Sequence, residues 1–302
     1  MADVEPKTRS GFVAILGRPN AGKSTLLNAL VGERLAAVTA KEQTTRHRIP
    51  GFLTREDLQI VFLDTPGLLD PRDPLQEAMV DAALGSLEGV DAIYWLVDHD
   101  EPAERERELL ERLDREDEAA LLLLLTKADQ VPDEKQDARE RRWGAVADWD
   151  GIFRVSAVTG EGVEDLVEAT RERLPRQPFF YPPEHLTDRS LRFLAAERIR
   201  EACYEELGAE LPYSIHVVVE EWREPAGADE KLAIRATVYV ERESQKGIVI
   251  GKGGSKLKAI GARARRAIEA LVGEPVYLSL WVKVRKKWSR RESDLRFFGY
   301  RR

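Results

Sequence analysis

Residues 17–24 read Gly17-Arg18-Pro19-Asn20-Ala21-Gly22-Lys23-Ser24, between an apolar run, Phe12–Leu16, and a helix-like stretch, Ser24–Val31. The spacing G-x-x-x-x-G-K-S, after a strand and before a helix, is that of a phosphate-binding loop. Glycine at both ends lets consecutive backbone N–H groups turn toward phosphate oxygens, and the helix N-terminus adds partial positive charge. The loop therefore predicts a nucleotide site in which Lys23 contacts the β- and γ-phosphates and Ser24 holds Mg²⁺.

Apolar runs and amphipathic stretches alternate through the next 150 residues. The further runs are Leu58–Leu63, Ala92–Val97, Ala119–Leu125 and the weaker Ile152–Val155. The helix-like stretches are Pro74–Leu87, Glu104–Asp114, Lys135–Val146 and Gly162–Leu174. Short buried strands alternating with helices predict an α/β domain with a mostly parallel sheet and helices on both faces. Ligands of such sheets bind beyond the carboxyl ends of the strands.

Three short motifs stand at those strand ends. Asp64-Thr65-Pro66-Gly67 follows the second run, where an aspartate can position Mg²⁺ and the Gly67 N–H can bond a γ-phosphate. Thr126-Lys127-Ala128-Asp129 follows the fourth. A carboxylate there can accept hydrogen bonds from N1–H and the 2-amino group of guanine, and a buried charge left unpaired by adenine discriminates against it. Ser156-Ala157 follows the fifth run, where a backbone N–H can bond the guanine O6.

These motifs, together with Thr44-Thr45-Arg46, resemble the five guanine-nucleotide motifs of translation-factor-related GTPases across residues 10–175. The resemblance implies a six-stranded sheet with one antiparallel strand near His47–Leu53. It also implies that Thr45, rather than Thr44, closes on Mg²⁺ and the γ-phosphate. The implied Mg²⁺ ligands are Ser24, Thr45 and Asp64. The implied nucleotide contacts are Gly17, Arg18, Pro19, Asn20, Ala21, Gly22, Lys23, Ser24, Thr25, Asp64, Gly67, Thr126, Lys127, Asp129, Ser156 and Ala157.

The chain departs from the family pattern in two places. Thr126 stands where these GTPases have asparagine, and a hydroxyl cannot reproduce the contacts of an amide. Leu68 follows Gly67, where many signalling GTPases place a water-orienting glutamine, so slow intrinsic hydrolysis is expected. GTPases with both an apolar residue there and an asparagine at the position of Asn20 include potassium-stimulated ones. Our hypothesis is that Asn20 helps to hold K⁺ at the phosphates, with Lys23, Thr45 and Gly67 completing the catalytic set.

The charge is divided unevenly along the chain. Residues 244–302 carry 16 Lys/Arg against 4 Asp/Glu, a formal charge of +12, which leaves −19 for the rest of a chain whose net charge is −7. A basic end on an acidic body indicates an anionic partner. Four prolines within residues 175–183 predict a semi-rigid connector. We therefore expect a GTPase domain over residues 1–175, a linker over 176–190 and a second domain over 191–302.

The second domain shows a helix–strand–strand–helix–helix–strand order. Its segments are Arg189–Leu207, Tyr213–Trp222, Lys231–Arg242, the stretch before Gly251, Ser255–Val272 and Val276–Val284. Gly251-Lys252-Gly253-Gly254 between two helical segments is similar to the G-x-x-G clamp of type II KH domains, an α+β fold that grips single-stranded nucleic acid by its backbone. The expected RNA contacts are Ile250, Gly251, Lys252, Gly253, Gly254, Lys256, Lys258, Lys286, Lys287 and Arg290.

The tail after Lys283 interleaves basic residues with four aromatic ones, Trp288, Phe297, Phe298 and Tyr300. Such a pattern suits single-stranded RNA through charge neutralisation and base stacking. The same aromatics fit equally well as core residues of a short terminal helix. The sequence alone leaves both interpretations open.

Over essentially its whole length the chain resembles the Era family of bacterial GTPases, through the nucleotide motifs, the proline-rich linker and Val249-Ile-Gly-Lys-Gly-Gly-Ser255. The resemblance implies GTP/GDP and Mg²⁺ as cofactors, binding near the 3′ end of 16S ribosomal RNA, a role in 30S subunit assembly and peripheral association with the inner membrane. A monomer is the default expectation. The rival interpretations are an RNA-binding module whose nucleotide site is structural and a non-ribosomal phosphotransferase.

Compartment signals are few. The single cysteine, Cys203, cannot form an intrachain disulfide, which suits the cytosol. The first residues have neither a basic start nor an apolar core, so no signal peptide is expected. The longest apolar run is too short to cross a bilayer. A cytoplasmic protein is therefore expected.

Overall fold

The computed structural model describes residues 6–39, 41–98, 103–111, 113, 119–208, 211–227 and 230–301. The chain divides into two compact units that interleave in sequence. The first comprises Met1–Ala36, Thr45–Asp70 and Met79–Asp188, and the second comprises Ala37–Thr44, Pro71–Ala78 and Arg189–Arg302. The expected continuous division at residues 175 and 191 therefore differs from the structure, because two short segments, 37–44 and 71–78, group with the second unit.

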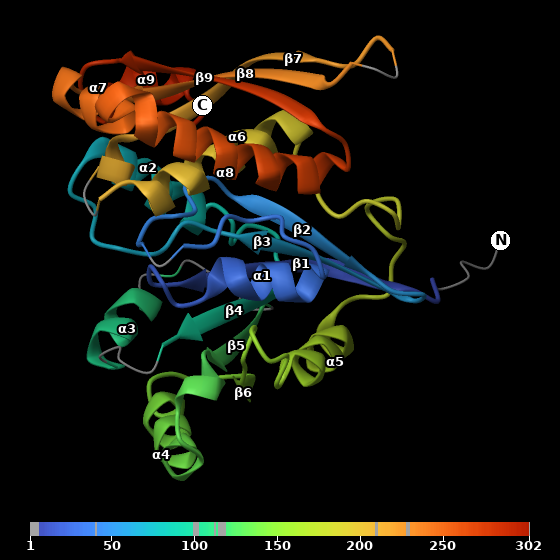
Figure 1. Ribbon diagram of the computed structural model, residues 1–302. Helices are drawn as coiled ribbons and strands as arrows, with labels where there is room; N and C mark the ends of the chain where they lie inside the picture. The colour runs from blue at the N-terminus through green and yellow to red at the C-terminus, as the bar shows by residue number, and fades with distance from the viewer. Residues whose placement is uncertain are drawn as a thin grey trace. The chain divides into compact units, whose positions relative to one another are not determined.

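The first unit is built on a six-stranded sheet (Figure 1). Its strands are β1 (Arg9–Gly17), β2 (Ile49–Thr54), β3 (Leu58–Asp64), β4 (Ala92–Val97), β5 (Ala120–Leu125) and β6 (Gly151–Arg154). The order is β2-β3-β1-β4-β5-β6, with β2 antiparallel to β3 and the other neighbours parallel. Every residue of β4 is buried, as expected for a strand covered on both faces. The predicted fold class and antiparallel strand are confirmed.

Five helices accompany this sheet in sequence. They are α1 (Lys23–Val31), α2 (Pro74–Leu84), α3 (Ala103–Leu110), α4 (Asp133–Gly144) and α5 (Val163–Arg173). The first residue of each helix lies within three residues of the predicted start. The predicted helix over Glu104–Asp114 reaches Arg112 and Asp114, which lie outside the described residues. Helix α2 stops before Gly85, short of the predicted Leu87, because glycine is a poor helix former.

The proline-rich stretch packs along the first unit. The Gln59 side chain donates to Tyr181 O (2.9 Å) and accepts from the backbone N–H of Phe180 (2.8 Å). The Tyr181 ring stacks on Phe52 with 4.0 Å between centroids, and Leu186 O accepts from the Phe52 N–H (2.8 Å). The linker is therefore ordered, and Phe180 and Tyr181 attach it to the first unit.

The second unit has the predicted order, with a three-stranded sheet, β7-β8-β9. Its main elements are α6 (Leu191–Glu206), β7 (His216–Arg223), β8 (Leu232–Val240), α7 (Glu243–Ile250), α8 (Ser255–Val272), β9 (Val276–Val284) and α9 (Glu292–Phe297). β7 and β8 pair antiparallel, whereas β8 and β9 pair parallel. One core cluster joins inward residues of β8, such as Val238, to Ile199 and Cys203 of α6 and to Ile260 of α8. Two helices thus cover one face of this sheet.

The tail aromatics are mostly core residues. Trp288, Phe298 and Tyr300 are 0%, 6% and 9% exposed, and their rings surround His216. Tyr300 Oη lies 2.9 Å from His216 Nδ1. Phe297 is 61% exposed. Three of the four aromatics therefore follow the core interpretation, and base stacking by them is ruled out.

Candidate nucleotide site and nucleic-acid interface

The phosphate loop closes beyond β1 through three residues with left-handed backbone. Gly17, Asn20 and Gly22 have φ of 146°, 66° and 93°. Gly22 is the N-cap of α1, so the helix starts at the loop. Lys23 is buried, and its Nζ donates to the carbonyls of Gly17 (3.0 Å) and Arg18 (2.7 Å). The loop thus keeps a buried ammonium group beside a helix N-terminus, which suits phosphate.

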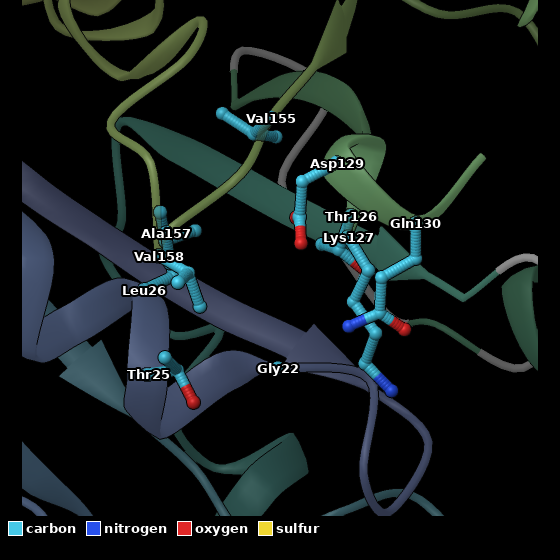
Figure 2. Close-up of a pocket in the computed structure, with 10 residues that line it drawn as sticks. All are labelled: Gly22, Thr25, Leu26, Thr126, Lys127, Asp129, Gln130, Val155, Ala157 and Val158. Carbon is cyan, nitrogen blue, oxygen red and sulfur yellow. The ribbon is translucent and has the colours of Figure 1, made fainter. Parts of the chain in front are cut away.

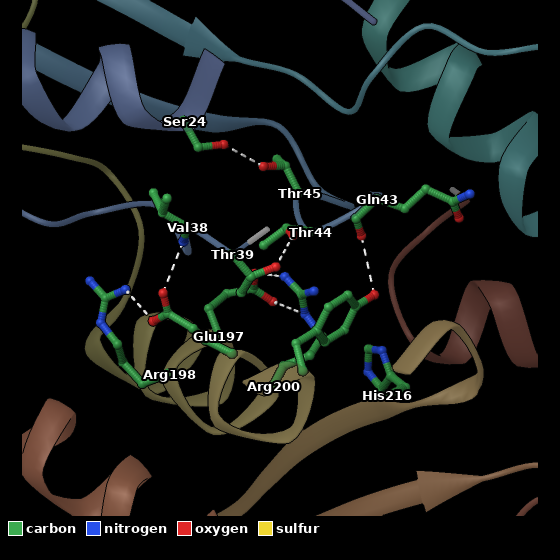
Figure 3. Close-up of polar contacts among 12 residues, drawn as sticks. Ser24, Val38, Thr39, Gln43, Thr44, Thr45, Glu197, Arg198, Arg200 and His216 are labelled. Carbon is green, nitrogen blue, oxygen red and sulfur yellow. Dashed lines mark hydrogen bonds and ion pairs between the residues drawn. The ribbon is translucent and has the colours of Figure 1, made fainter. Parts of the chain in front are cut away.

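Three oxygen atoms converge beside this loop. Ser24 Oγ lies 2.6 Å from Thr45 Oγ1 (Figure 3). The same hydroxyl donates to Asp64 Oδ2 over 2.7 Å. Thr45 Oγ1 also donates to Asp64 Oδ2, over 3.3 Å. Thr44 differs, since its hydroxyl donates to Lys41 O (2.7 Å) and lies 2.7 Å from Thr39 Oγ1. The threonine that faces Ser24 is therefore Thr45.

The chemistry of this cluster fits Mg²⁺. Asp64 is fully buried, and its Oδ1 has no hydrogen-bond partner. Burial raises the pKa of its carboxyl group to about 6, against the opposing effects of the Ser24 hydroxyl and the Lys23 charge. An unpaired buried carboxylate oxygen beside two hydroxyl oxygens is a hard-oxygen donor set, which Mg²⁺ prefers. The cluster contains a single carboxylate, and no group of three or more His, Cys, Asp or Glu suited to a metal occurs among the described residues.

The segment after β3 is held against the phosphate loop. A Cβ at Gly67 would lie 2.6 Å from the backbone nitrogen of Pro19, so only glycine fits there. The Leu68 N–H donates to Gly17 O (3.0 Å), and the Leu68 side chain is buried in the core. Leu68 therefore lies where it cannot orient water, in agreement with its apolar chemistry.

A pocket lies beside the loop (Figure 2). It has a volume of about 100 Å³ and is lined by Gly22, Thr25, Leu26, Thr126, Lys127, Asp129, Gln130, Val155, Ala157 and Val158. Asp129 is exposed and lies in the 3₁₀ turn η1 (Ala128–Gln130), which follows β5 and Lys127, a residue with φ of 54°. Apolar side chains on one side and a carboxylate on the other suit a flat base with a polar edge.

The two residues of the Ser156-Ala157 pair have different surroundings. Its backbone N–H donates to Glu161 O (3.0 Å) and its hydroxyl accepts from the Thr159 N–H (3.1 Å). Because that N–H is used within the loop, it is not available to a base, and Ala157 is the residue of the pair that lines the pocket.

The structure adds two acidic residues that the sequence analysis missed. Lys127 Nζ donates to Asp98 Oδ2, and Arg18 Nε donates to Glu106 Oε1. Glu106 is fully buried, and its other oxygen accepts from Trp95 Nε1 (3.0 Å). Asp98 could have been found, because it directly follows the apolar run Ala92–Val97 at a strand end. Glu106 lies in a highly charged helix, and no pattern separates it from its solvated neighbours.

The G-x-x-G segment of the second unit has the geometry of a backbone clamp. Gly251, Gly253 and Gly254 have φ of 73°, 60° and 82°. A Cβ at Gly251 would lie 2.8 Å from Cβ of Lys256, whereas Gly253 and Gly254 face open space. Gly254 is the N-cap of α8, which directs its N–H groups toward the loop.

The predicted RNA contacts are accessible around this turn. Lys252, Lys256 and Lys258 are exposed, and Ile250 is half-buried at the end of α7. Lys256 Nζ also donates to Glu206 O (2.8 Å). Beyond β9, Lys286, Lys287 and Arg290 are exposed. The structure thus presents all these cations to solvent.

Comparison with known proteins matches the two parts of the chain to two different families. The family described as 50S ribosome-binding GTPase matches residues 12–127, and the KH domain family matches residues 210–289. GTPase Era of Geotalea uraniireducens (strain Rf4) is 46% identical over 297 residues, covering 98% of this chain and 99% of the relative. The chain belongs to the Era family.

Two solved Era structures are similar to this chain over 97% of its length and 99% of their own, each at 36% identity. One is Era in complex with MgGDPNP and nucleotides 1506–1542 of 16S ribosomal RNA, with a TM-score of 0.91. The other is a point variant of Aquifex aeolicus Era bound to GDP·AlF4⁻, with a TM-score of 0.93. Era family membership gives this chain a GTPase domain followed by a KH domain, as the sequence predicted.

Proposed function

We propose that this chain is a GTP-hydrolysing switch that binds small-subunit ribosomal RNA near its 3′ end and acts in 30S subunit assembly. The observation that carries the enzymatic half is the convergence of Ser24, Thr45 and Asp64 oxygens within 3.3 Å of one another. The observation that supports the RNA half is the three-glycine turn at the N-terminus of α8. The similar Era structure in complex with MgGDPNP and 16S ribosomal RNA supports the same assignment.

At the nucleotide site, Ser24, Thr45 and Asp64 would hold Mg²⁺, which neutralises charge on the β- and γ-phosphates. Lys23 would contact the same phosphates from the loop, and the Gly67 N–H would contact the γ-phosphate. Asp129 would accept hydrogen bonds from the guanine edge while Lys127 covers the base. In this assignment Thr45 and Gly67 respond to the third phosphate, because each lies in a segment that can change its contacts on hydrolysis.

The residue after Gly67 cannot orient the attacking water, because Leu68 is apolar and buried in the core. Asn20, exposed at the tip of the phosphate loop, remains our candidate for holding K⁺. Steady-state GTP hydrolysis should be faster in K⁺ than in Na⁺ at matched ionic strength, and Asn20→Ala should remove that difference. Equal rates in both salts would contradict the role of Asn20, and no turnover even with RNA present would favour the structural rival.

RNA binding is tested most directly at the clamp. Gly253 and Gly254 have left-handed backbone that aspartate tolerates, and a side chain at either would enter open space. Gly253→Asp with Gly254→Asp should therefore cost some backbone strain but avoid steric clash, and should repel phosphates. Fluorescence anisotropy with an oligonucleotide of the small-subunit RNA 3′ end should show loss of binding, with GTP binding retained. Gly227→Asp, in the β7–β8 connection, adds one negative charge to the same unit and should bind normally.

Peripheral association with the inner membrane stays a prediction from family resemblance. Among the described helices, none has an apolar stretch sufficient to span a bilayer. Flotation of the full chain with vesicles of phosphatidylethanolamine and phosphatidylglycerol would test the prediction, and recovery of all protein in the unbound fraction would contradict it.

A further inference from the structure

The position of the Asp129 carboxylate depends on the backbone of the short loop that carries it. This loop follows β5, turns at Lys127, which has left-handed backbone, and continues into η1, one turn of 3₁₀-helix. A carboxylate that reads two donors on one base edge must be held in direction as well as distance. The restraints on this short loop therefore bear on base selectivity.

Helix α4 sends two buried polar side chains back to this loop. Gln136 is 5% exposed, and its Nε2 donates to Ala128 O (3.0 Å) and Val131 O (3.1 Å). Arg139 is 8% exposed, and its Nη2 donates to Thr126 O (2.9 Å) and Val97 O (3.0 Å). Residues three apart share one face of a helix, so both reach the loop from the same side. Together they donate to two carbonyls of the recognition motif, those of Thr126 and Ala128, to the Val131 carbonyl after it and to the Val97 carbonyl at the end of β4.

The carbonyl of Val97, at the end of β4, gathers several of these bonds. It accepts from the Thr126 N–H (3.1 Å) and from Arg139, and it lies 3.0 Å from Thr126 Oγ1. The same hydroxyl lies 2.8 Å from Ala21 O in the phosphate loop. A hydroxyl has a single proton to donate to these two carbonyls, whereas the asparagine amide of related GTPases has two. Arg139 therefore supplies a charged donor to the backbone around Thr126, where this chain has a hydroxyl in place of the amide.

We propose that Arg139, supported by Gln136, is a positioning residue for guanine recognition in this chain. It acts through the loop backbone and touches no part of the nucleotide. The inference rests on the proposed function in placing guanine at Asp129. Removal of the guanidinium leaves two buried carbonyls without their charged donor, so the loop shifts toward water and carries the Asp129 carboxylate away from the base edge.

The experiment compares affinities for GDP and IDP, since inosine lacks the 2-amino group that Asp129 would read. Arg139→Met should reduce the GDP/IDP affinity ratio by about tenfold, the size expected when a charged hydrogen-bond partner is lost. Arg141→Met removes an exposed arginine from the same helix and should leave the ratio unchanged. Arg139→Lys keeps the charge and should recover part of the ratio. A merely structural role would weaken both nucleotides equally.

Two further variants keep the outcome interpretable. If Arg139→Met does not fold, Gln136→Met tests the same bracing with a neutral side chain of similar length and should lower the ratio by a smaller factor. Asp129→Asn tests the proposed site itself and should collapse the ratio. An unchanged ratio in Asp129→Asn would overturn the placement of guanine. A collapsed ratio there, with a ratio within twofold of wild type in folded Arg139→Met and Gln136→Met, would overturn only the role of α4.

Discussion

At the scale of single residues, the site depends on which hydroxyl or carboxylate stands at the end of each strand. Ser24 is in the first turn of α1, Asp64 ends β3 and Thr45 lies between α1 and β2 in sequence, yet their oxygens meet. The parallel sheet brings strand ends to one edge, which explains why residues forty positions apart share a site. The adjacent Thr44 and Thr45 differ in which neighbours their hydroxyls reach.

These two threonines provide a matched test of the Mg²⁺ assignment. Thr45→Ala should slow GTP hydrolysis by about tenfold or more, because it removes one oxygen beside a charged centre. GDP affinity should change little, since the threonine is assigned to the γ-phosphate and metal. Single-turnover hydrolysis over a range of Mg²⁺ concentrations would measure both effects. Thr44→Ala is the control, and a larger effect from it than from Thr45→Ala would reverse the assignment.

Cys203 gives a test at the same scale of how the second unit is packed. The thiol is fully buried within α6, and burial raises its pKa to about 12. Because the folded pKa is raised, the stabilisation is complete below the unfolded thiol pKa of about 8.5 and is lost as the pH rises through 12. Ellman's reagent at pH 8 should therefore fail to label the native protein and should label one thiol in denaturant. Rapid native labelling would show that α6 is not packed as described.

At the scale of elements, helix and strand positions followed from hydrophobic periodicity, whereas the roles of polar helices did not. Strand β4 is a continuous apolar run, and β3 is apolar except for Gln59 and the terminal Asp64, so their burial could be predicted. Helix α4 has few apolar residues, and periodicity assigns its polar residues to solvent. Gln136 and Arg139 are buried only because the loop after β5 supplies backbone carbonyls to them. A contact of that kind depends on tertiary placement and leaves no signal in the local pattern.

Two adjacent aromatics stand at the end of α9, Phe297 as its last residue and Phe298 directly after it. The sequence alone could not tell which of them is buried. Phe298 is 6% exposed and packs on His216, whereas Phe297 is 61% exposed. Phe298→Ala should lower the free energy of unfolding by about 3 kcal/mol, as expected for a buried phenylalanine. Phe297→Ala should lower it by less than about 1 kcal/mol. Urea unfolding followed by tryptophan fluorescence would measure both, and equal losses would contradict the arrangement of the tail.

At the scale of the whole molecule, the two units interleave at the segments expected to respond to nucleotide. Residues 37–44 directly precede Thr45, and residues 71–78 follow the Asp64–Gly67 motif, yet both segments group with the second unit. Segments of eight residues, one of which includes the start of α2, are too short for a hydrophobic pattern to tell which unit they belong to. For that reason the sequence predicts one continuous domain over residues 1–175.

Segment 37–44 is fastened to α6 within the second unit. The Val38 N–H donates to Glu201 Oε1 (2.9 Å), and Tyr204 Oη donates to Gln43 O (3.2 Å). Lys41 Nζ donates to the carbonyls of Tyr204 and Leu207 at the end of the helix, where a cation is favoured, although burial lowers its pKa. Since Thr45 is assigned to Mg²⁺ and the γ-phosphate, nucleotide state and α6 act on opposite ends of one short stretch of chain.

Lys41→Met should therefore uncouple RNA binding from nucleotide state. The variant keeps the length of the side chain but removes the donor to the α6 carbonyls, so movement of Thr45 is no longer transmitted through this segment. In the wild-type chain we expect RNA affinity to differ between GDPNP and GDP, and in Lys41→Met the ratio should fall toward one while nucleotide affinity stays within about threefold. Glu42→Gln changes an exposed neighbour and should preserve the ratio. A full ratio in Lys41→Met would place the coupling elsewhere, with residues 71–78 as the next segment to test, because Arg301 Nη2 donates to Glu77 Oε2 there (3.3 Å).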